Sequence, residues 1–235
     1  MKPAVQGRGT PSVVRPRRSP RSLAWTAGAL LVLPFLFWLL RPVRVVPRLR
    51  LAPAFSFVDQ DGGTLTSEDL RGEVFVLTFG YLGCSARCYP TDSIMRALQD
   101  RLAEVDAGDV RVRLVSVSFD AERDTPAELR AAAVARGAKG GAWTFAAAGR
   151  PVVTTALRDG FEVWVEPDEG GGFRYSPVFV VVDGQGVLRA RYWLGLPDVD
   201  DLVRDLRLIT REARVATGPA RLAYEAAHLF ACYAR

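Results

Sequence analysis

The sequence predicts an α/β fold for the part of the chain after residue 50, and three observations carry this prediction. Short β-rich runs alternate with helical runs, which is typical of a sheet covered by helices. No internal repeat or low-complexity segment interrupts the alternation. About 185 residues, in a chain with 49% hydrophobic residues, are enough to form one domain with a full core.

Each expected element has its own signal in the sequence. Runs of β-branched, aliphatic and aromatic residues predict strands, and turns rich in Asp and Gly separate them. The helix over residues 126–136 has the clearest start, with Thr125 in the capping position, Pro126 in the first helical position and Glu128 three residues past the cap. The predicted strands are residues 55–58, 74–79, 111–119, 143–146, 161–165, 178–182 and 188–193. The predicted helices are residues 91–105, 126–136, 151–158, 197–212 and 219–233.

Charge is distributed unevenly along the chain. The 31 Lys and Arg exceed the 26 Asp and Glu and give a net charge of +5. Residues 1–50 hold ten of the cations and no acid, so residues 51–235 hold the other 21 cations and all 26 acids, a net charge of −5. An acidic folded part does not favour binding to phosphates, and we expect no nucleic-acid partner. The positive charge instead points to targeting.

Residues 23–40, LAWTAGALLVLPFLFWLL, form an uncharged run of 18 residues between arginine-containing flanks. As a helix with about 1.5 Å rise per residue, this run is just long enough to cross a bilayer core of about 30 Å. It is apolar on all sides, which favours a transmembrane anchor over a buried amphipathic helix. A cleaved signal peptide remains the alternative, but the small residues around Pro53 lie far beyond the apolar run.

The flanking cations predict the orientation of a single-pass protein. Six cations precede the run and four follow it, which favours a cytoplasmic N-terminus. Residues 1–22 are then a basic cytoplasmic tail. Residues 41–51, with two prolines and four arginines, are expected to be a stiff extended linker. The remainder of the chain would lie on the outer side of the membrane, in the periplasm of a bacterium with two membranes.

Two of the three cysteines, Cys84 and Cys88, lie in the predicted loop between a strand end and a helix start. Three cysteines are too few for a disulfide scaffold. The positive end of a helix dipole stabilises a thiolate, so this position suits exchange-competent cysteines. The spacing of four residues allows either a disulfide or a soft metal ion between two thiolates. A permanent disulfide that only staples the loop, or two buried free thiols, is the alternative interpretation.

Four motifs in order resemble the Sco/SenC family over about residues 52–210. They are Phe55-Ser-Phe-Val-Asp59 with Gly62; Phe79-Gly80-Tyr81 with Cys84-Ser-Ala-Arg-Cys88 and Pro90; Ser118-Phe-Asp120-Ala-Glu-Arg123-Asp124-Thr125-Pro126; and Val180-Val-Val-Asp183-Gly-Gln-Gly186. The resemblance implies a thioredoxin-like fold for residues 52–212, with residues 213–235 as an extra C-terminal helical extension.

The resemblance also implies where the protein acts and with what. It implies an anchor in the bacterial inner membrane, a domain facing the periplasm, and a role in maturing the copper centre of cytochrome c oxidase. The implied partners are the copper-binding subunit of the oxidase and proteins that donate thiols, disulfides or copper. The implied metal is copper, held or handled by Cys84 and Cys88, and no nucleotide cofactor is expected.

The chain departs from the family pattern at the metal site. Copper-binding members have a histidine two residues before the position of Pro177, where this chain has Tyr175. A phenol with a pKa near 10 is a poor ligand for soft Cu(I), which prefers thiolate and imidazole. Two thiolates could still hold Cu(I), so Cu(I) is favoured over Cu(II). Ser85, Ala86 and Arg87 also replace the usual Pro and Asp between the cysteines.

Pro177 stands where thioredoxin-like reductases carry a cis proline that faces the redox cysteines, and the resemblance leaves both isomers open for the Ser176-Pro177 bond. Together with the missing histidine, this proline favours thiol–disulfide exchange, in which Cys84 attacks and Cys88 resolves the mixed disulfide. The alternative function is a copper chaperone that binds Cu(I) through Cys84 and Cys88. A third possibility is an interaction protein whose cysteines are only structural.

The remaining candidates lie outside the cysteine motif. His228 and Cys232 are four residues apart on the C-terminal helix and could complete a copper site. In the alternative interpretation this helix is amphipathic, and Leu222, Leu229 and Phe230 pack on the domain or on a membrane. Asp120, Arg123 and Asp124 match a family loop and have no assigned role beyond electrostatics or partner contact. The tryptophans Trp143, Trp164 and Trp193 fall in predicted strands and are expected in the core.

Overall fold

The computed structural model describes residue 32, residues 44–84 and residues 89–230. The predicted tail, nearly all of the predicted anchor, Cys88 and Cys232 lie outside these residues. None of the helices within the described part is long and apolar enough to cross a membrane. The chain divides into two units, Met1–Pro42 and Val43–Arg235, and the second unit contains the sheet and the cysteine loop.

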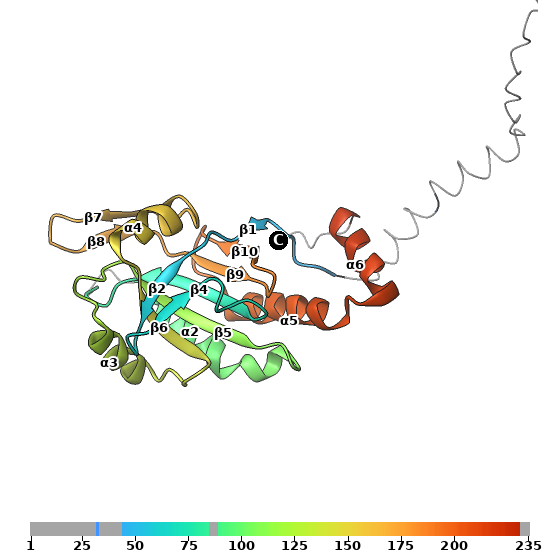
Figure 1. Ribbon diagram of the computed structural model, residues 1–235, viewed down its shortest axis with the longest axis horizontal. Helices are drawn as coiled ribbons and strands as arrows, with labels where there is room; N and C mark the ends of the chain where they lie inside the picture. The colour runs from blue at the N-terminus through green and yellow to red at the C-terminus, as the bar shows by residue number, and fades with distance from the viewer. Residues whose placement is uncertain (1–31, 33–43, 85–88, 231–235) are drawn as a thin grey trace, which may run out of the picture. The chain divides into compact units, whose positions relative to one another are not determined.

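An eight-stranded mixed sheet forms the centre of this unit, in the order β1-β10-β9-β4-β5-β6-β2-β3 (Figure 1). β4 and β5, and β5 and β6, pair in parallel, and the other neighbours are antiparallel. The strands are β1 (Arg50–Leu51), β2 (Ser56–Asp59), β3 (Thr64–Thr66), β4 (Val74–Gly80), β5 (Val112–Ser118), β6 (Trp143–Ala147), β9 (Phe179–Val182) and β10 (Val187–Tyr192). The predicted α/β class is therefore confirmed.

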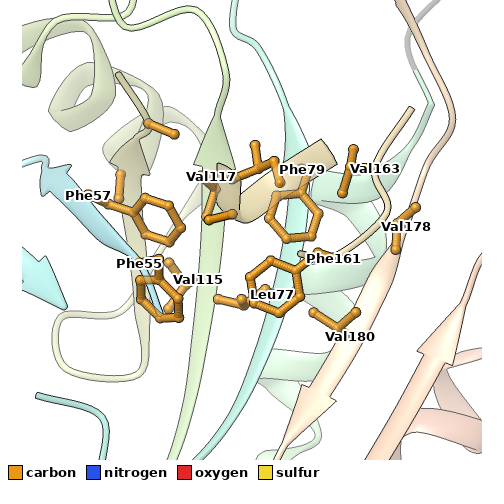
Figure 2. Packing of buried hydrophobic residues seen from close by; sticks show 14 of the residues in the cluster. Phe55, Phe57, Leu77, Phe79, Val115, Val117, Phe161, Val163, Val178 and Val180 are labelled. Atoms are coloured by element: carbon orange, nitrogen blue, oxygen red, sulfur yellow. The ribbon is translucent and has the colours of Figure 1, made fainter. Parts of the chain in front are cut away.

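Three longer helices cover one face of this sheet, and an aromatic layer together with a short helix and a π turn covers the other. The helices are α2 (Thr91–Asp100), α3 (Pro126–Arg136), α4 (Arg150–Val152), α5 (Val199–Val215) and α6 (Gly218–Phe230), with short 3₁₀ and π turns η1 (Leu102–Val105) and η2 (Val153–Arg158). α2, α3 and α5 pack on the face that contains Val74 and Val76 of β4. The alternate residues of β4, including Leu77 and Phe79, pack against Phe55, Phe57 and Phe161 on the other face (Figure 2). Burial of both faces accounts for the nearly continuous apolar sequence of β4.

A second, two-stranded sheet stands apart from the first and was not predicted. β7 (Val165–Pro167) pairs with β8 (Phe173–Tyr175) in an antiparallel hairpin. Of the expected strand at residues 161–165, only Val165 belongs to a strand, as the first residue of β7, although Phe161 and Val163 are also buried. The expected single helix at residues 91–105 is likewise split at Arg101 into α2 and η1.

The expected linker belongs in part to the domain. Val45 and Val46 are fully buried, and β1 pairs with β10. A chain segment whose side chains enter the core and whose backbone joins the sheet is fixed to the domain, so the expectation of a free spacer is wrong for residues 45–51.

Two finer expectations are wrong. Thr125 directly precedes α3, but its side chain makes no capping hydrogen bond. Trp143 is buried as expected, whereas Trp164 and Trp193 are 46% and 53% exposed. Leu222 and Leu229 are 74% and 78% exposed, so of the two surfaces expected to cover them, the domain does not, and a membrane contact stays a prediction. The side chain of Phe230 lies outside the described part.

Candidate functional site

The predicted cysteine loop lies at the carboxyl end of β4. The strand ends at Gly80 and α2 begins at Thr91, so Cys84 follows a central strand and precedes a helix N-terminus, as the sequence predicts. The backbone carbonyl of Gly80 accepts a hydrogen bond from the amide of Phe119 at 3.0 Å. Parallel pairing of β4 and β5 therefore brings the chain that follows each strand to the same edge of the sheet.

Cys84 is half-buried and disulfide-bonded. The other two cysteines of the chain, Cys88 and Cys232, lie outside the described residues. Cys84 also lines two cavities. One, of about 100 Å³, lies above the polar ends of β4 and β5 at Thr78 and Ser118. The second, of about 590 Å³, lies between the cysteine loop and the β7–β8 hairpin.

Tyr175 lies in both cavities with Cys84, at the position where the family resemblance implies a ligand. Its phenolic oxygen is 3.6 Å from the place that a Cβ on Gly80 would take, and the backbone of Tyr89 hydrogen-bonds it. Burial raises the pKa of Tyr175 to about 12, and the Tyr89 amide offsets only part of that rise. The phenol therefore stays protonated at neutral pH and is a poor ligand for copper.

Aromatic rings form the walls around this phenol. The ring centroid of Tyr175 lies 5.4 Å from that of Tyr89, 5.2 Å from that of Phe119 and 6.1 Å from that of Tyr81, all in edge-on arrangements. Phe173 packs edge-on against Tyr81 at 5.2 Å. Such pairs are attractive and exclude water, so this end of the domain is apolar and rigid without being closed.

Pro177 is placed differently from the expectation for a redox proline. It is buried shortly before β9, but it does not line either cavity that contains Cys84. No described peptide bond is cis, so the Ser176-Pro177 bond is trans. Of the two isomers that the resemblance leaves open, the structure therefore has the trans isomer.

His228 lies at the other end of the sheet. Its Nε2 is 2.9 Å from Oε1 of Glu212, which also pairs with Arg189. Arg189 in turn pairs with Asp183, the residue after β9, and β9 runs antiparallel to β4. This cluster therefore lies beside the start of β4, while Cys84 follows its end, about 20 Å away for a strand of that length. His228 and Cys84 are not brought together.

The described residues do not include a group of three or more His, Cys, Asp or Glu side chains that could hold a metal ion. In the part of the site that is described, Cys84 has Tyr175 beside it in place of an imidazole. This donor set does not suit a three-ligand Cu(II) centre.

Sequence reasoning missed three residues that shape the site. Tyr81 and Tyr89 flank the cysteine motif and line both cavities. Asp124 accepts a hydrogen bond from the amide of Leu82 at 2.8 Å. The aromatic character of positions 81 and 89 could have been noted from the sequence. The contact of Asp124 could not, because 42 residues separate it from Leu82.

Known proteins resemble this chain over the same region. A model of the family described as SCO1/SenC matches residues 46–210. The SCO1 protein homolog of Bacillus subtilis is 37% identical over 76 residues, which are 32% of this chain and 38% of that protein. A putative copper-binding protein of Stutzerimonas stutzeri is 36% identical over 89 residues, 37% of this chain and 42% of that protein. The aligned stretches thus span less than half of either relative.

The solved structure of BsSco resembles the fold. BsSco is described as a member of the Sco family of cytochrome c oxidase assembly proteins with a disulfide switch. It is 25% identical, has a TM-score of 0.61, and aligns over 71% of this chain and 97% of its own. The predicted thioredoxin-like fold is confirmed by this likeness. Because the family model spans well over half of the sequence, the chain belongs to the SCO1/SenC family.

Proposed function

We propose that this protein takes part in maturing the copper centre of cytochrome c oxidase by thiol–disulfide exchange through Cys84 and Cys88. One observation carries the proposal: Cys84 is disulfide-bonded at the rim of two cavities whose described walls contain phenols and no imidazole. The description of BsSco as an oxidase assembly protein with a disulfide switch supports the same chemistry.

The exchange has two steps. The thiolate of Cys84 attacks one sulfur of a client disulfide, a bond forms between the two sulfurs, and the other client sulfur leaves as a thiolate that takes up a proton. The thiolate of Cys88 then attacks the Cys84 sulfur, and the first client sulfur leaves and is protonated. The client gains two electrons, and the chain ends as a disulfide. A dithiol donor protein would restore the chain to its reduced form.

The surroundings of Cys84 suit these steps. The N-terminus of a helix carries partial positive charge because its first backbone amides are unpaired, and this charge favours a thiolate over a thiol close to it. The protonated phenol of Tyr175 adds no charge and does not oppose that thiolate. The 590 Å³ cavity beside the half-exposed Trp164 leaves room for a client segment to approach the sulfur.

Membrane attachment is part of the proposal. Residues 23–40 would anchor the protein in the inner membrane, with residues 52–212 in the periplasm near the copper-binding subunit of the oxidase. The short distance in sequence between residue 40 and the buried Val45 would keep the domain close to the membrane surface.

The test uses the full chain in lipid nanodiscs. We expect the disulfide to equilibrate with glutathione and the reaction to be lost in Cys84→Ser and Cys88→Ser. Cys232→Ser is the matched control and should behave as the wild type. A disulfide that resists reduction, or reduced thiols that do not exchange with glutathione, would contradict the proposal.

A copper chaperone is the second candidate, and the likeness to a putative copper-binding protein favours it. Copper would then be the cargo, held as Cu(I) between Cys84 and Cys88. An anaerobic titration should show one tightly bound equivalent that either serine variant abolishes. Tyr175→His should add Cu(II) binding with a thiolate charge-transfer band, and Tyr175→Phe should not. Exchange with glutathione and no tight Cu(I) binding would exclude this candidate.

A further inference from the structure

Residues 118–124 lie between β5 and α3. They contact the cysteine loop and the β7–β8 hairpin, which are the two walls of the larger cavity beside Cys84. The segment folds into a turn in which the carbonyl of Asp120 accepts hydrogen bonds from the amides of Arg123 at 3.1 Å and Asp124 at 2.8 Å. The amide of Asp120 donates to Oγ of Ser118 at 3.0 Å. The turn directs the two charged side chains, Arg123 and Asp124, to different parts of the site.

Asp124 holds the cysteine loop. It is 4% exposed, and its Oδ2 accepts hydrogen bonds from the amide of Leu82 at 2.8 Å and from Oγ of Ser118 at 2.5 Å. Leu82 lies two residues before Cys84. Hydrogen bonds to a carboxylate are about twice as strong as those between neutral groups. The loop that carries Cys84 is thus fastened to the end of β5 by a buried charge.

Arg123 holds the opposite wall. Its Nε pairs with Oδ2 of Asp120 at 2.5 Å, and its Nη1 donates to the carbonyl of Gly171 at 2.6 Å. Its guanidinium lies over the ring of Phe173, 5.7 Å from the centroid. Gly171 and Phe173 belong to the β7–β8 hairpin and line the larger cavity. The same turn therefore contacts the cysteine loop and the hairpin.

Tyr81 links these two walls to each other. Its hydroxyl oxygen accepts a hydrogen bond from the amide of Phe173 at 3.3 Å. A Cβ at Gly172 would lie 2.7 Å from that oxygen, so a larger residue there would displace the Tyr81 hydroxyl. Tyr81 directly precedes Leu82, so the loop is held by Asp124 on one side and by the hairpin on the other.

We propose that Asp124 is a positioning residue for Cys84: it fixes the loop through Leu82, and Arg123 sets the hairpin against the same loop, so that the turn at residues 118–124 controls the reactivity of the thiol. This inference deepens the proposed function and rests on it for the meaning of that reactivity. It gives a role to the family motif at Asp120, Arg123 and Asp124, which the exchange chemistry leaves unexplained.

The following variants distinguish an effect of Asp124 on the position of the cysteine loop from an effect on the overall stability of the protein. Asp124→Ala removes both hydrogen bonds, Asp124→Asn keeps one acceptor oxygen without the charge, and Ser118→Ala removes one donor. Asp183→Asn is the matched control, because Asp183 is also buried and its Oδ1 accepts two amide hydrogen bonds, from Gln185 and Val187 at 3.0 Å each, at the other end of the sheet.

Two readouts are measured on the reduced full chain in nanodiscs, together with the thermal midpoint. The first is the pH profile of alkylation of the Cys84 peptide, followed by mass spectrometry. The second is hydrogen exchange of the segment that contains Leu82. We expect Asp124→Ala to change the alkylation rate about tenfold and to speed exchange at Leu82, since small displacements of a reacting group have effects of this size or larger. Asp124→Asn should lie between Asp124→Ala and the wild type.

The outcomes are decisive in either direction. If Asp124→Ala lowers the thermal midpoint as Asp183→Asn does and leaves both readouts unchanged, Asp124 is only structural and the inference fails. If Asp124→Ala does not fold, Asp124→Asn and Ser118→Ala decide, and wild-type values in both would overturn the inference. If the wild-type thiols do not exchange with glutathione, the proposed function fails. The alkylation profile and hydrogen exchange still test whether Asp124 positions the loop that carries Cys84.

Discussion

The two ends of β4 use polar groups in opposite ways. At the carboxyl end, Cys84 lines two cavities together with Tyr175, whose phenol stays uncharged at neutral pH. At the amino end, charged side chains are paired with one another. There, Arg189 is 3% exposed and pairs with Asp183 at 2.9 Å and with Glu212 at 2.6 Å. The first end leaves Cys84 at the rim of two cavities, and the second pairs its buried charges with one another beside a cavity of about 510 Å³.

The charged end ties together parts of the chain that are far apart in sequence. Arg189 also donates to the backbone carbonyl of Val46 at 2.7 Å. Glu212 of α5 pairs with Arg48 at 2.9 Å and contacts His228 of α6. The network therefore joins the segment before β1 to both C-terminal helices. The comparison teaches that a cluster of ionisable residues is not by itself a reactive site: the buried charges at the amino end pair with one another, whereas the buried carboxyl of Asp124 at the carboxyl end binds the loop that carries Cys84.

The largest expected effect comes from breaking the charged network at its centre. Arg189→Met leaves Asp183 buried without its cation and leaves Glu212 with Arg48 and His228 only, and removal of one member of a buried pair costs about 3–5 kcal/mol of unfolding free energy. Urea unfolding measures this loss. The reduction potential of the Cys84 disulfide should stay unchanged.

Arg150→Ala is the surface control, because Arg150 and its partner Glu122 are exposed and solvent-exposed pairs contribute little to stability. A shift in the reduction potential of the Arg189 variant would show that the two ends of β4 are coupled. It would contradict the separate roles assigned to them.

The second effect is a pH dependence that belongs to the charged end. Burial alone would raise the pKa of Glu212, but hydrogen bonds from His228 and Arg189 and the charge of Arg189 outweigh it and hold the pKa at about 2. Because this value lies below that of the unfolded chain, the stabilisation is complete above about pH 4.5 and is lost as the pH falls toward 2.

We expect Glu212 to account for about 1–2 kcal/mol of the stability lost between pH 7 and pH 3. Urea unfolding at both pH values measures this loss. Glu212→Gln should be less stable at pH 7 and should show a flatter decline, whereas Glu68→Gln, at an exposed position, should decline as the wild type does. If the stability of Glu212→Gln declined with pH as steeply as that of the wild type, the pH dependence could not be assigned to Glu212.

The smallest effect concerns α6. His228→Ala removes the contact with Glu212, and we expect a loss of about 1 kcal/mol, the usual contribution of one hydrogen bond. Hydrogen exchange in α6 should become faster while exchange near Cys84 stays the same. Leu229→Ala is the control on the exposed side of the helix and should change neither quantity. Loss of copper binding in His228→Ala would contradict the separation of the two ends.

Elements with strong local signals were predicted well. The bounds of α3 match the expectation at both ends, because Pro126 suits a first helical turn and Gly137 adopts the positive φ of a helix end. β4 was predicted nearly residue for residue because burial on both faces demands a continuous apolar run. The β7–β8 hairpin was missed because three-residue strands leave no periodic pattern to detect.

Burial was harder to predict than secondary structure. Trp164 and Trp193 are large and apolar, yet both are more than 40% exposed, since neither faces a helix layer. Val45 and Val46 lie between charged and proline residues in sequence, but they fill the core beside α5. The hydrophobicity of a side chain shows that its burial would be favourable in free energy. Whether the folded protein has room to bury that side chain depends on how distant elements pack.

The sequence by itself determined the α/β class, the central strands, the position of Cys84 between a strand and a helix, and the presence of Tyr175 in place of histidine. These features depend on local periodicity and on residue identity, which a sequence displays directly. Tertiary structure alone decided that Tyr175 lines the same cavities as Cys84, that Asp124 holds Leu82, and that His228 lies at the far end of the sheet. Each of these depends on contacts across 16 to 91 residues, which exist only once the sheet has paired its strands.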